Sequence, residues 1–179
     1  VGMAVGMALS ERYLNSIVKI ENKNSSLIDY YTYCLCGDGD LMEGVSYEAL
    51  SFASTQNLNK LILLYDKNNV SLDSDTKKTF TEDIEIRFEA LDFNIINVKN
   101  GGDYKEISKA IKQAKKSSRP SIIICNTTIG KDSKLEGTNT VHGKPLDSED
   151  LANIRNKYKI TNEAFDVSKE VLDYLQNYV

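Results

Sequence analysis

The sequence lacks several features that mark whole classes of protein. None of its apolar runs approaches the length that a membrane-spanning helix needs, which argues against a membrane role. It has no excess of basic residues, and a formal net charge of -4 with a pI near 5.1 argues against a surface that gathers the phosphates of nucleic acid. It also has no internal repeat and no low-complexity tract.

Cysteine and histidine are scarce. The three cysteines, Cys34, Cys36 and Cys125, are an odd number and lie inside apolar segments. This pattern fits buried thiols in a reducing compartment better than a disulfide framework, so we expect a cytoplasmic protein. The only histidine is His142, and a lone histidine is more often structural than functional.

The hydrophobic periodicity indicates an α/β protein. Helix-like patterns alternate with short strand-like runs, and strands separated by helices require parallel crossovers. We therefore expect one parallel sheet flanked by helices on both faces. The expected strands are 30–36, 61–66, 93–98 and 121–127, and the expected helices are 1–20, 42–56, 83–91, 104–116, 151–158 and 165–178.

Two segments and the C-terminal region fall outside this alternation. Residues 21–29 are polar and predict a surface loop. Residues 128–148 show no periodicity, and a loop of that length in a compact domain is usually functional or disordered; we expect function. The last two helices no longer follow the rhythm of the sheet. We therefore divide the chain into a module at 1–158 and a helical tail, or the start of a linker, at 159–179.

Polar side chains follow two of the expected strands. Gly37-Asp38-Gly39 comes after the first strand, and Asp66-Lys67-Asn68-Asn69 ends the second. Ligands of open α/β sheets bind beyond the carboxyl ends of the strands, where glycines allow close backbone approach and the helix expected from Met42 offers free N–H groups to an anion. Asp38 would repel a bare phosphate, but Mg²⁺ takes carboxylate, amide and phosphate oxygens together. The pattern predicts a metal-diphosphate site.

The spacing of these motifs resembles that of a known cofactor site. Gly-Asp-Gly alone occurs in many turns, but here 28 residues separate Gly39 from Asn68, which matches the thiamine diphosphate motif. The wider sequence resembles transketolase, in order along the chain from Val1 to about Tyr158. The segments that carry this resemblance are GDGDLMEGVSYEAL, LILLYDKNNVSLD, RFEAL, TTIGKDS and VHGKPL.

The resemblance implies a thiamine diphosphate-binding fold and a set of site residues. Asp38, Asn68 and the carbonyl of Val70 would hold Mg²⁺ or Ca²⁺, Gly37 and Gly39 would shape the diphosphate turn, and Leu72 and Ile129 would contact the cofactor. His142 would lie beside the diphosphate and the reacting centre. Glu43 would join a carboxylate network between subunits, or simply be a favourable acid in the first turn of a helix. Asp40 falls at a variable position and is taken as solvated surface.

Two departures from the family pattern affect this interpretation. Asn139 stands where the family commonly has a second histidine, so the substrate contacts there are expected to differ. Lys131-Asp132 replaces an aromatic-glycine pair after Gly130, so the backbone over the diphosphate is expected to differ too.

The resemblance also implies an activity and partners. A transketolase transfers a two-carbon ketol unit between sugar phosphates in the pentose phosphate pathway, as a dimer built from two α/β modules per subunit. The chain is expected to begin inside the first module and to lack the second, which carries the glutamate that activates the aminopyrimidine ring, so these residues alone should be inert. Two alternatives stay open: a deoxyxylulose phosphate synthase, and a non-catalytic module that binds cofactor or a partner.

Overall fold

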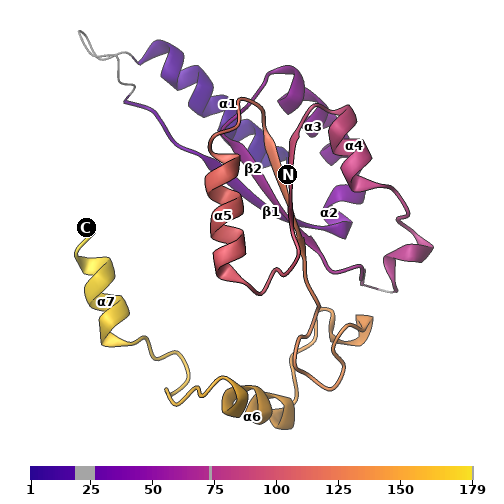
Figure 1. Cartoon of the computed structure of the whole chain (residues 1–179), viewed down its shortest axis with the longest axis vertical. Coiled ribbons are helices and arrows are strands. Elements are labelled where there is room, and N and C mark those ends of the chain that lie inside the picture. Colours follow the sequence, from indigo (N-terminus) through magenta and orange to yellow (C-terminus); the bar gives the residue numbers. More distant parts are fainter. Residues whose placement is uncertain (19–26, 73, 179) are drawn as a thin grey trace.

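A computed structural model describes residues 1–18, 27–72 and 74–178 and places four parallel strands in one sheet. Their order across the sheet is β1-β2-β4-β3 (Figure 1). The strands are β1 (Thr32–Gly37), β2 (Leu61–Lys67), β3 (Asn94–Val98) and β4 (Ser121–Asn126). The helices are α1 (Gly2–Ile17), α2 (Asp38–Met42), α3 (Gly44–Thr55), α4 (Ile84–Ala90), α5 (Tyr104–Ala114), α6 (Ser148–Lys157) and α7 (Lys169–Gln176), with 3₁₀ turns η1 (Thr76–Lys78) and η2 (Asn139–Val141).

The burial of each strand follows its place in the sheet. β2 and β4 are the central strands, and their runs of Leu and Ile are buried on both faces, as in parallel sheets covered by helices. β1 is an edge strand in which buried and exposed residues alternate. Its outward-facing Tyr33 and Leu35 are 47% and 78% exposed, so the described residues cover about half of Tyr33 and little of Leu35.

Helices pack on both faces of the sheet (Figure 1). On one face, α1, α3 and α4 bury their apolar sides against β1, β2 and β4, with Leu50 and Phe88 fully buried. On the other face, Ala110 and Ala114 of α5 pack on Ile62 and Ile123. The predicted α/β sheet with helices on both faces is confirmed.

The predicted helix over 42–56 is wrong at its start. A helical turn, α2, already begins at Asp38, and the chain leaves helical geometry at Glu43, where ψ is 134°. α3 then begins at Gly44. Hydrophobic periodicity does not detect a one-residue break, because α2 and α3 both bury apolar residues. The free N–H groups expected at Met42 therefore do not exist there, since Met42 ends α2.

The remaining predicted elements lie within a few residues of the observed ones, which is the usual margin because helix and strand ends fray. The predicted end of the first helix at 19–20 and most of the loop at 21–29 lie outside the described residues. Several helices begin where an aspartate caps the first turn, at Asp83, Asp103 and Asp147. The three cysteines are free and buried, as predicted, and burial raises the pKa of Cys36 to about 12.

The C-terminal third departs from the sheet, as expected. Residues 128–148 form a loop with one short 3₁₀ turn, followed by α6 and by α7, which has no buried residue and lies away from the sheet in Figure 1. The division of the chain at residue 158 stays a prediction. None of the helices in the described part of the chain combines the length and the apolar character needed to cross a membrane.

Candidate functional site

The two polar motifs lie side by side at one edge of the sheet. Parallel pairing places Gly37, the last residue of β1, opposite Asp66 near the end of β2. A cavity of about 320 Å³ opens there, lined by Asp38, Tyr65, Lys67 and Asn69 among others. A larger hollow of about 520 Å³ lies between α1 and the residues that lead into β2, at the opposite end of the strands. Because ligands of parallel sheets bind at carboxyl ends, the smaller cavity is the candidate site.

Asp38 is a buried acid with one oxygen held and one left over. Asp38 is only 4% exposed, and its Oδ1 accepts a hydrogen bond of 2.5 Å from the hydroxyl of Tyr65. Its Oδ2 is buried and has no hydrogen-bond partner among the described residues. Burial raises the pKa of Asp38, and hydrogen bonding from the hydroxyl of Tyr65 and from the backbone N–H of Asn69 partly offsets that effect. A buried, unpaired carboxylate oxygen is costly unless it serves a ligand such as a cation.

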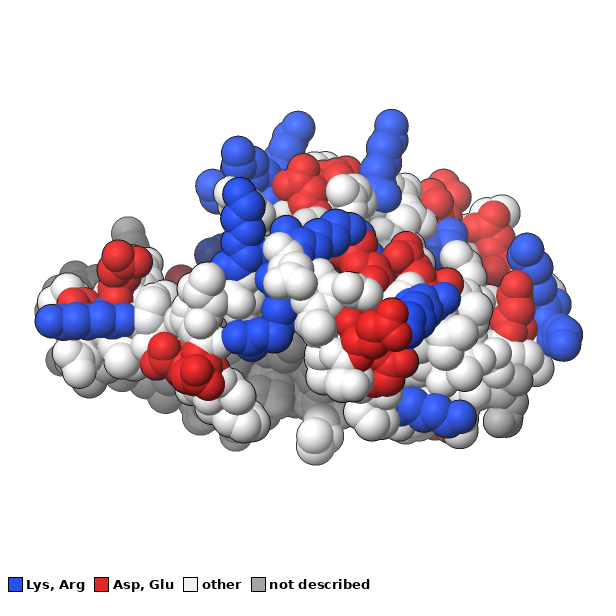
Figure 2. Space-filling model, turned by 90° about the horizontal axis from the view of Figure 1, so that it is seen from below, with Lys and Arg blue, Asp and Glu red and all other residues white. Residues whose placement is uncertain are grey.

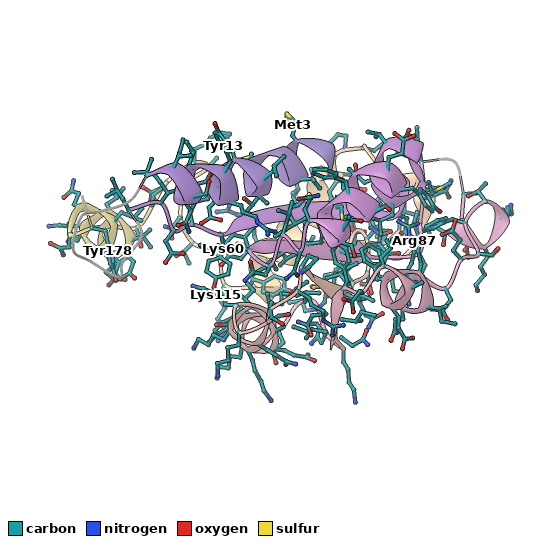
Figure 3. The ribbon with its side chains drawn as sticks, turned by 90° about the horizontal axis from the view of Figure 1, so that it is seen from above. Met3, Tyr13, Lys60, Arg87, Lys115 and Tyr178 are labelled. Carbon is teal, nitrogen blue, oxygen red and sulfur yellow. The ribbon has the colours of Figure 1, made fainter. Side chains whose placement is uncertain are left out.

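The turn that carries Asp38 is held from two sides. The carboxylate of Asp40 accepts a hydrogen bond of 2.9 Å from the backbone N–H of Gly37. Arg87 of α4, labelled in Figure 3, donates from Nη1 to the carbonyl of Leu41 and to Glu82, each at 3.0 Å. Its guanidinium also lies 4.0 Å from the ring centre of Tyr47. Asp40, expected to be solvated surface, is exposed but stabilises the turn.

The end of β2 holds Asn68 in one orientation. The Nδ2 of Asn68 donates to Asp66 at 3.1 Å, and its Oδ1 accepts from the N–H of Val70 at 3.0 Å. An amide oxygen has two lone pairs, so Oδ1 keeps one for a further ligand. Asn69 has φ of 60°, a left-handed conformation that asparagine tolerates better than most residues. This turn sets the direction of the chain at Val70.

The glycines of the Gly-Asp-Gly motif have no structural need to be glycine. Gly37 has φ of -110°, which any residue adopts, and Gly39 is not in the left-handed region. A Cβ added at either position would meet no atom within 4 Å. The space above the turn is therefore open on the protein side, and close approach of a ligand is a physical reason for glycine at both positions.

The other expected site residues lie on separate segments of the chain. Leu72 is 65% exposed on the loop after Val70, and Glu43 is exposed at the break between α2 and α3. Ile129 is half-buried in the loop after β4. No hydrogen bond among the described residues joins any of them, or His142, to Asp38 or Asn68. Their roles toward a cofactor therefore stay predictions.

His142 lies just after η2, and Gly130 brings that turn close to the end of β4. Gly130 has φ of 60°, and a Cβ there would come within 2.6 Å of Val141. Only glycine allows this approach without strain. The Nδ1 of His142 is buried and has no hydrogen-bond partner in the described part of the chain. A buried ring nitrogen without a partner is costly unless a ligand supplies one.

Asp132, one of the two departures from the family pattern, fastens the loop to α6. Its carboxylate accepts hydrogen bonds from Lys157 and from the hydroxyl of Tyr158, and the bond from Lys157 is the main cause that holds its pKa below the usual value. Farther along the loop, the N–H of Lys134 donates to the buried Asp150 at 3.0 Å. The loop that carries His142 is therefore tied to α6 near both ends of that helix.

Replacing Asp132 should loosen this attachment. We expect Asp132→Ala to speed amide hydrogen exchange in the second half of α6 by several-fold, with little change in the sheet, because two side chains lose their acceptor. Since pairing lowers the pKa of Asp132, the protection it gives is present above the usual value of 3.8 and is lost as pH falls through the lowered pKa. Exchange monitored by mass spectrometry, at neutral pH and at acid pH, measures both effects.

A matched control for this prediction is Asp166→Ala in the exposed segment before α7. That substitution removes the same charge from the same region but no contact to α6. Equal exchange in the Asp132 variant and the unchanged protein would show that α6 is held by other contacts.

Asp38 and Asn68 are too few to complete the coordination of a metal ion, so a metal site here would need ligands from another molecule. Within residues 1–18, 27–72 and 74–178, no three His, Cys, Asp or Glu side chains are placed to hold a metal ion together. Asp38 and Asn68 offer hard oxygen ligands, which suit Mg²⁺ or Ca²⁺. Such a cation would need further oxygen ligands, and a diphosphate over the open glycine turn would supply them.

Comparison with known proteins assigns the family. All 179 residues match the domain family described as transketolase, thiamine diphosphate binding domain. The chain belongs to this family. Over 178 residues it is 44% identical to the transketolase of Halalkalibacterium halodurans, and over 171 residues it is 46% identical to that of Streptococcus pyogenes. These matches cover 98% and 95% of the chain but only 26% and 23% of those proteins.

Solved transketolase structures share the fold of the domain. The transketolase from Leishmania mexicana matches with a TM-score of 0.88 and 43% identity over 95% of this chain. A transketolase variant from Pichia stipitis matches with a TM-score of 0.91 and 35% identity over 98% of this chain. In each case the chain spans 26% of the solved chain, about a quarter of its length. The thiamine diphosphate-binding fold expected from the sequence is thereby confirmed.

The sequence pattern assigns no supporting role to three residues that contact the expected ligands or their turn. Tyr65 and Arg87 contact Asp38 and the turn that follows it, and Asp66 contacts Asn68. In the sequence, Asp66 stands out only as part of a polar strand end. Tyr65 does carry a usable signal, because a polar hydroxyl just before the end of a buried strand needs a partner at the same edge of the sheet.

Proposed function

We propose that this domain holds the diphosphate and the divalent metal ion of thiamine diphosphate in a transketolase, and that the metal ion is Mg²⁺. The reaction is the transfer of a two-carbon ketol unit from a ketose phosphate to an aldose phosphate, in the pentose phosphate pathway. The observation that carries the proposal is the buried, unpaired Oδ2 of Asp38 beside the open glycine turn. The transketolase relatives support it over a deoxyxylulose phosphate synthase and over a non-catalytic module.

Different residues of the domain would bind different parts of the cofactor. Asp38 and Asn68 would direct oxygen atoms at the cation, and the carbonyl of Val70 would be the third protein ligand. Gly37 and Gly39 leave room for the diphosphate to approach the backbone. Thiamine diphosphate, when bound, supplies the carbon-carbon bond chemistry of ketol transfer. Leu72 and Ile129 are apolar residues that shield the cofactor from water.

His142 acts at the phosphate side of the cofactor. Its buried Nδ1 has no described partner, so the imidazole can donate a hydrogen bond to a diphosphate oxygen or move a proton at the reacting centre. The loop that carries it is fixed to α6 through Asp132, which limits how far the ring can move.

Figure 2 shows the face of the molecule seen from below. Acidic and basic side chains are interspersed on it, so no charge of one sign dominates that face.

Turnover needs a second module, which we infer packs on the exposed apolar surfaces of this domain. Met3 and Tyr13 point away from the sheet on the outer side of α1 (Figure 3), and they are 86% and 63% exposed. Leu35 of β1 is 78% exposed. Apolar surface of this kind supports burial against another module or a second subunit, as in a homo-oligomer, with Glu43 in the carboxylate network between them. The free buried cysteines support a cytoplasmic location.

Calorimetry tests the cofactor proposal. Thiamine diphosphate is titrated into the full-length protein with and without Mg²⁺, and we expect binding that depends on the metal, because the diphosphate would otherwise meet the unscreened Asp38. Binding of equal strength without any divalent metal would contradict the metal bridge. Ketol transfer by these 179 residues in the absence of any other module would contradict the need for a partner.

A further inference from the structure

Two consecutive residues of β2 each contact one of the side chains proposed to hold the metal ion. The hydroxyl of Tyr65 donates to Oδ1 of Asp38 at 2.5 Å, and both residues are almost fully buried, with 1% and 4% exposed. The carboxylate of Asp66 accepts from Nδ2 of Asn68 at 3.1 Å. Neither contact closes the site, because Oδ2 of Asp38 and one lone pair of the Asn68 oxygen are left for a ligand.

The geometry of the strand explains how neighbours in sequence serve two different ligands. Successive side chains of a strand point to opposite faces of the sheet. Tyr65 points into the core under α1, α3 and α4, where its ring is buried among their apolar side chains. Asp66 points to the other side, where the hydroxyl of Thr127 also donates to it. Each positioning group is therefore fixed by contacts of its own.

We propose that Tyr65 and Asp66 are positioning residues for the metal ion, Tyr65 through Asp38 and Asp66 through Asn68. The inference rests on the proposed metal site. Tyr65 holds one carboxylate oxygen so that the other faces the cation, and Asp66 takes the amide nitrogen so that the amide oxygen faces the cation. Outer groups of this kind orient metal ligands in many proteins, and their loss typically weakens metal binding about 10- to 100-fold.

The two roles have a consequence for metal choice. Mg²⁺ requires near-ideal octahedral geometry with short bonds, whereas Ca²⁺ accepts six to eight oxygens in flexible arrangements. Ligands that are free to rotate should therefore harm Mg²⁺ binding more than Ca²⁺ binding. A residue that merely stabilises the fold would weaken both ions to the same extent.

The test compares both metals in one variant. Tyr65→Phe keeps the buried ring and removes only the hydroxyl. Mg²⁺ and Ca²⁺ are each titrated by calorimetry into the full-length protein with thiamine diphosphate present. We expect Mg²⁺ affinity to fall about 10- to 100-fold and Ca²⁺ affinity to fall several-fold less. The matched control is Tyr31→Phe, which removes a hydroxyl bonded to the carbonyl of Lys115, outside the cavity; it should leave both affinities unchanged.

A second pair of variants tests the Asn68 side of the proposal. Asp66→Ala removes the acceptor and should lower Mg²⁺ affinity to a similar extent, while Asp66→Asn keeps an oxygen that can accept from Asn68 and should recover part of the loss. Thermal unfolding without metal checks that each variant is folded. Tyr65→Phe keeps the buried ring, so the metal titrations of that variant still test the proposal if Asp66→Ala fails to fold.

The outcomes distinguish a failure of the proposed function from a failure of the positioning roles alone. If the unchanged protein shows no metal-dependent binding of thiamine diphosphate, the proposed function fails. If the unchanged protein binds but Tyr65→Phe and Asp66→Ala keep Mg²⁺ affinity within about twofold, or lose Mg²⁺ and Ca²⁺ affinity equally, only the positioning roles fail.

Discussion

Asp38→Ala should abolish metal-dependent binding of thiamine diphosphate. The substitution removes the carboxylate that we propose as a metal ligand, whose Oδ2 is buried and has no hydrogen-bond partner among the described residues. Loss of a direct ligand should exceed the roughly 10- to 100-fold effect of losing an outer group, so we expect more than about 100-fold weaker binding in the presence of Mg²⁺. Calorimetric titration of thiamine diphosphate with Mg²⁺ measures the change.

The matched control for Asp38 is Asp92→Ala. Asp92 precedes β3 at the opposite end of the sheet and forms an exposed ion pair with Arg119, so its removal changes the net charge equally without touching the cavity. We expect the Asp92→Ala variant to bind thiamine diphosphate with the same affinity as the unchanged protein. An Asp38 variant that also bound with unchanged affinity would remove this residue from the metal site, and the buried oxygen would then need another explanation.

His142→Ala should lower turnover about 100- to 10,000-fold in the full-length enzyme, the range expected when one acid-base group is lost. Cofactor binding should stay within a few-fold of normal, because in the proposed site the metal ion and the glycine turn would provide most of the attachment. A steady-state assay with a ketose phosphate donor and an aldose phosphate acceptor measures turnover, and calorimetry measures binding.

Two further variants define what His142 contributes. Lys144 lies in the same loop and its side chain is exposed, so Lys144→Ala should leave turnover unchanged. His142→Gln keeps an N–H donor, so partial recovery would indicate hydrogen bonding to the diphosphate, and no recovery would indicate proton movement. Normal turnover in His142→Ala would return this histidine to a structural role.

Much of the fold could be predicted from the sequence because its signals are local. The apolar runs of β2 and β4 are continuous, as burial on both faces requires, and the alternation of strands and helices leaves little choice except parallel pairing. The break at Glu43 could not be predicted in this way. It depends on one backbone angle, ψ of Glu43, and the apolar pattern continues across it.

The site was predictable only in part, for a similar reason. Asp38 and Asn68 stand at recognisable positions in a spaced motif, so the sequence alone is enough to name them. Tyr65 and Arg87 could not be named in this way, because their contacts join residues 27 and 46 positions apart in the chain. Such contacts exist only when strands or helices from different segments meet.

The sequence by itself determined the α/β fold class, the buried thiols and the polar ends of two adjacent strands. These follow from residue type and spacing, which act along the chain. Only the tertiary structure decided that one oxygen of Asp38 is held by Tyr65 while the other stays buried without a described partner, and that the loop carrying His142 is fastened to α6 through Asp132. The physical reason is that burial and hydrogen-bond partners depend on which distant segments pack together.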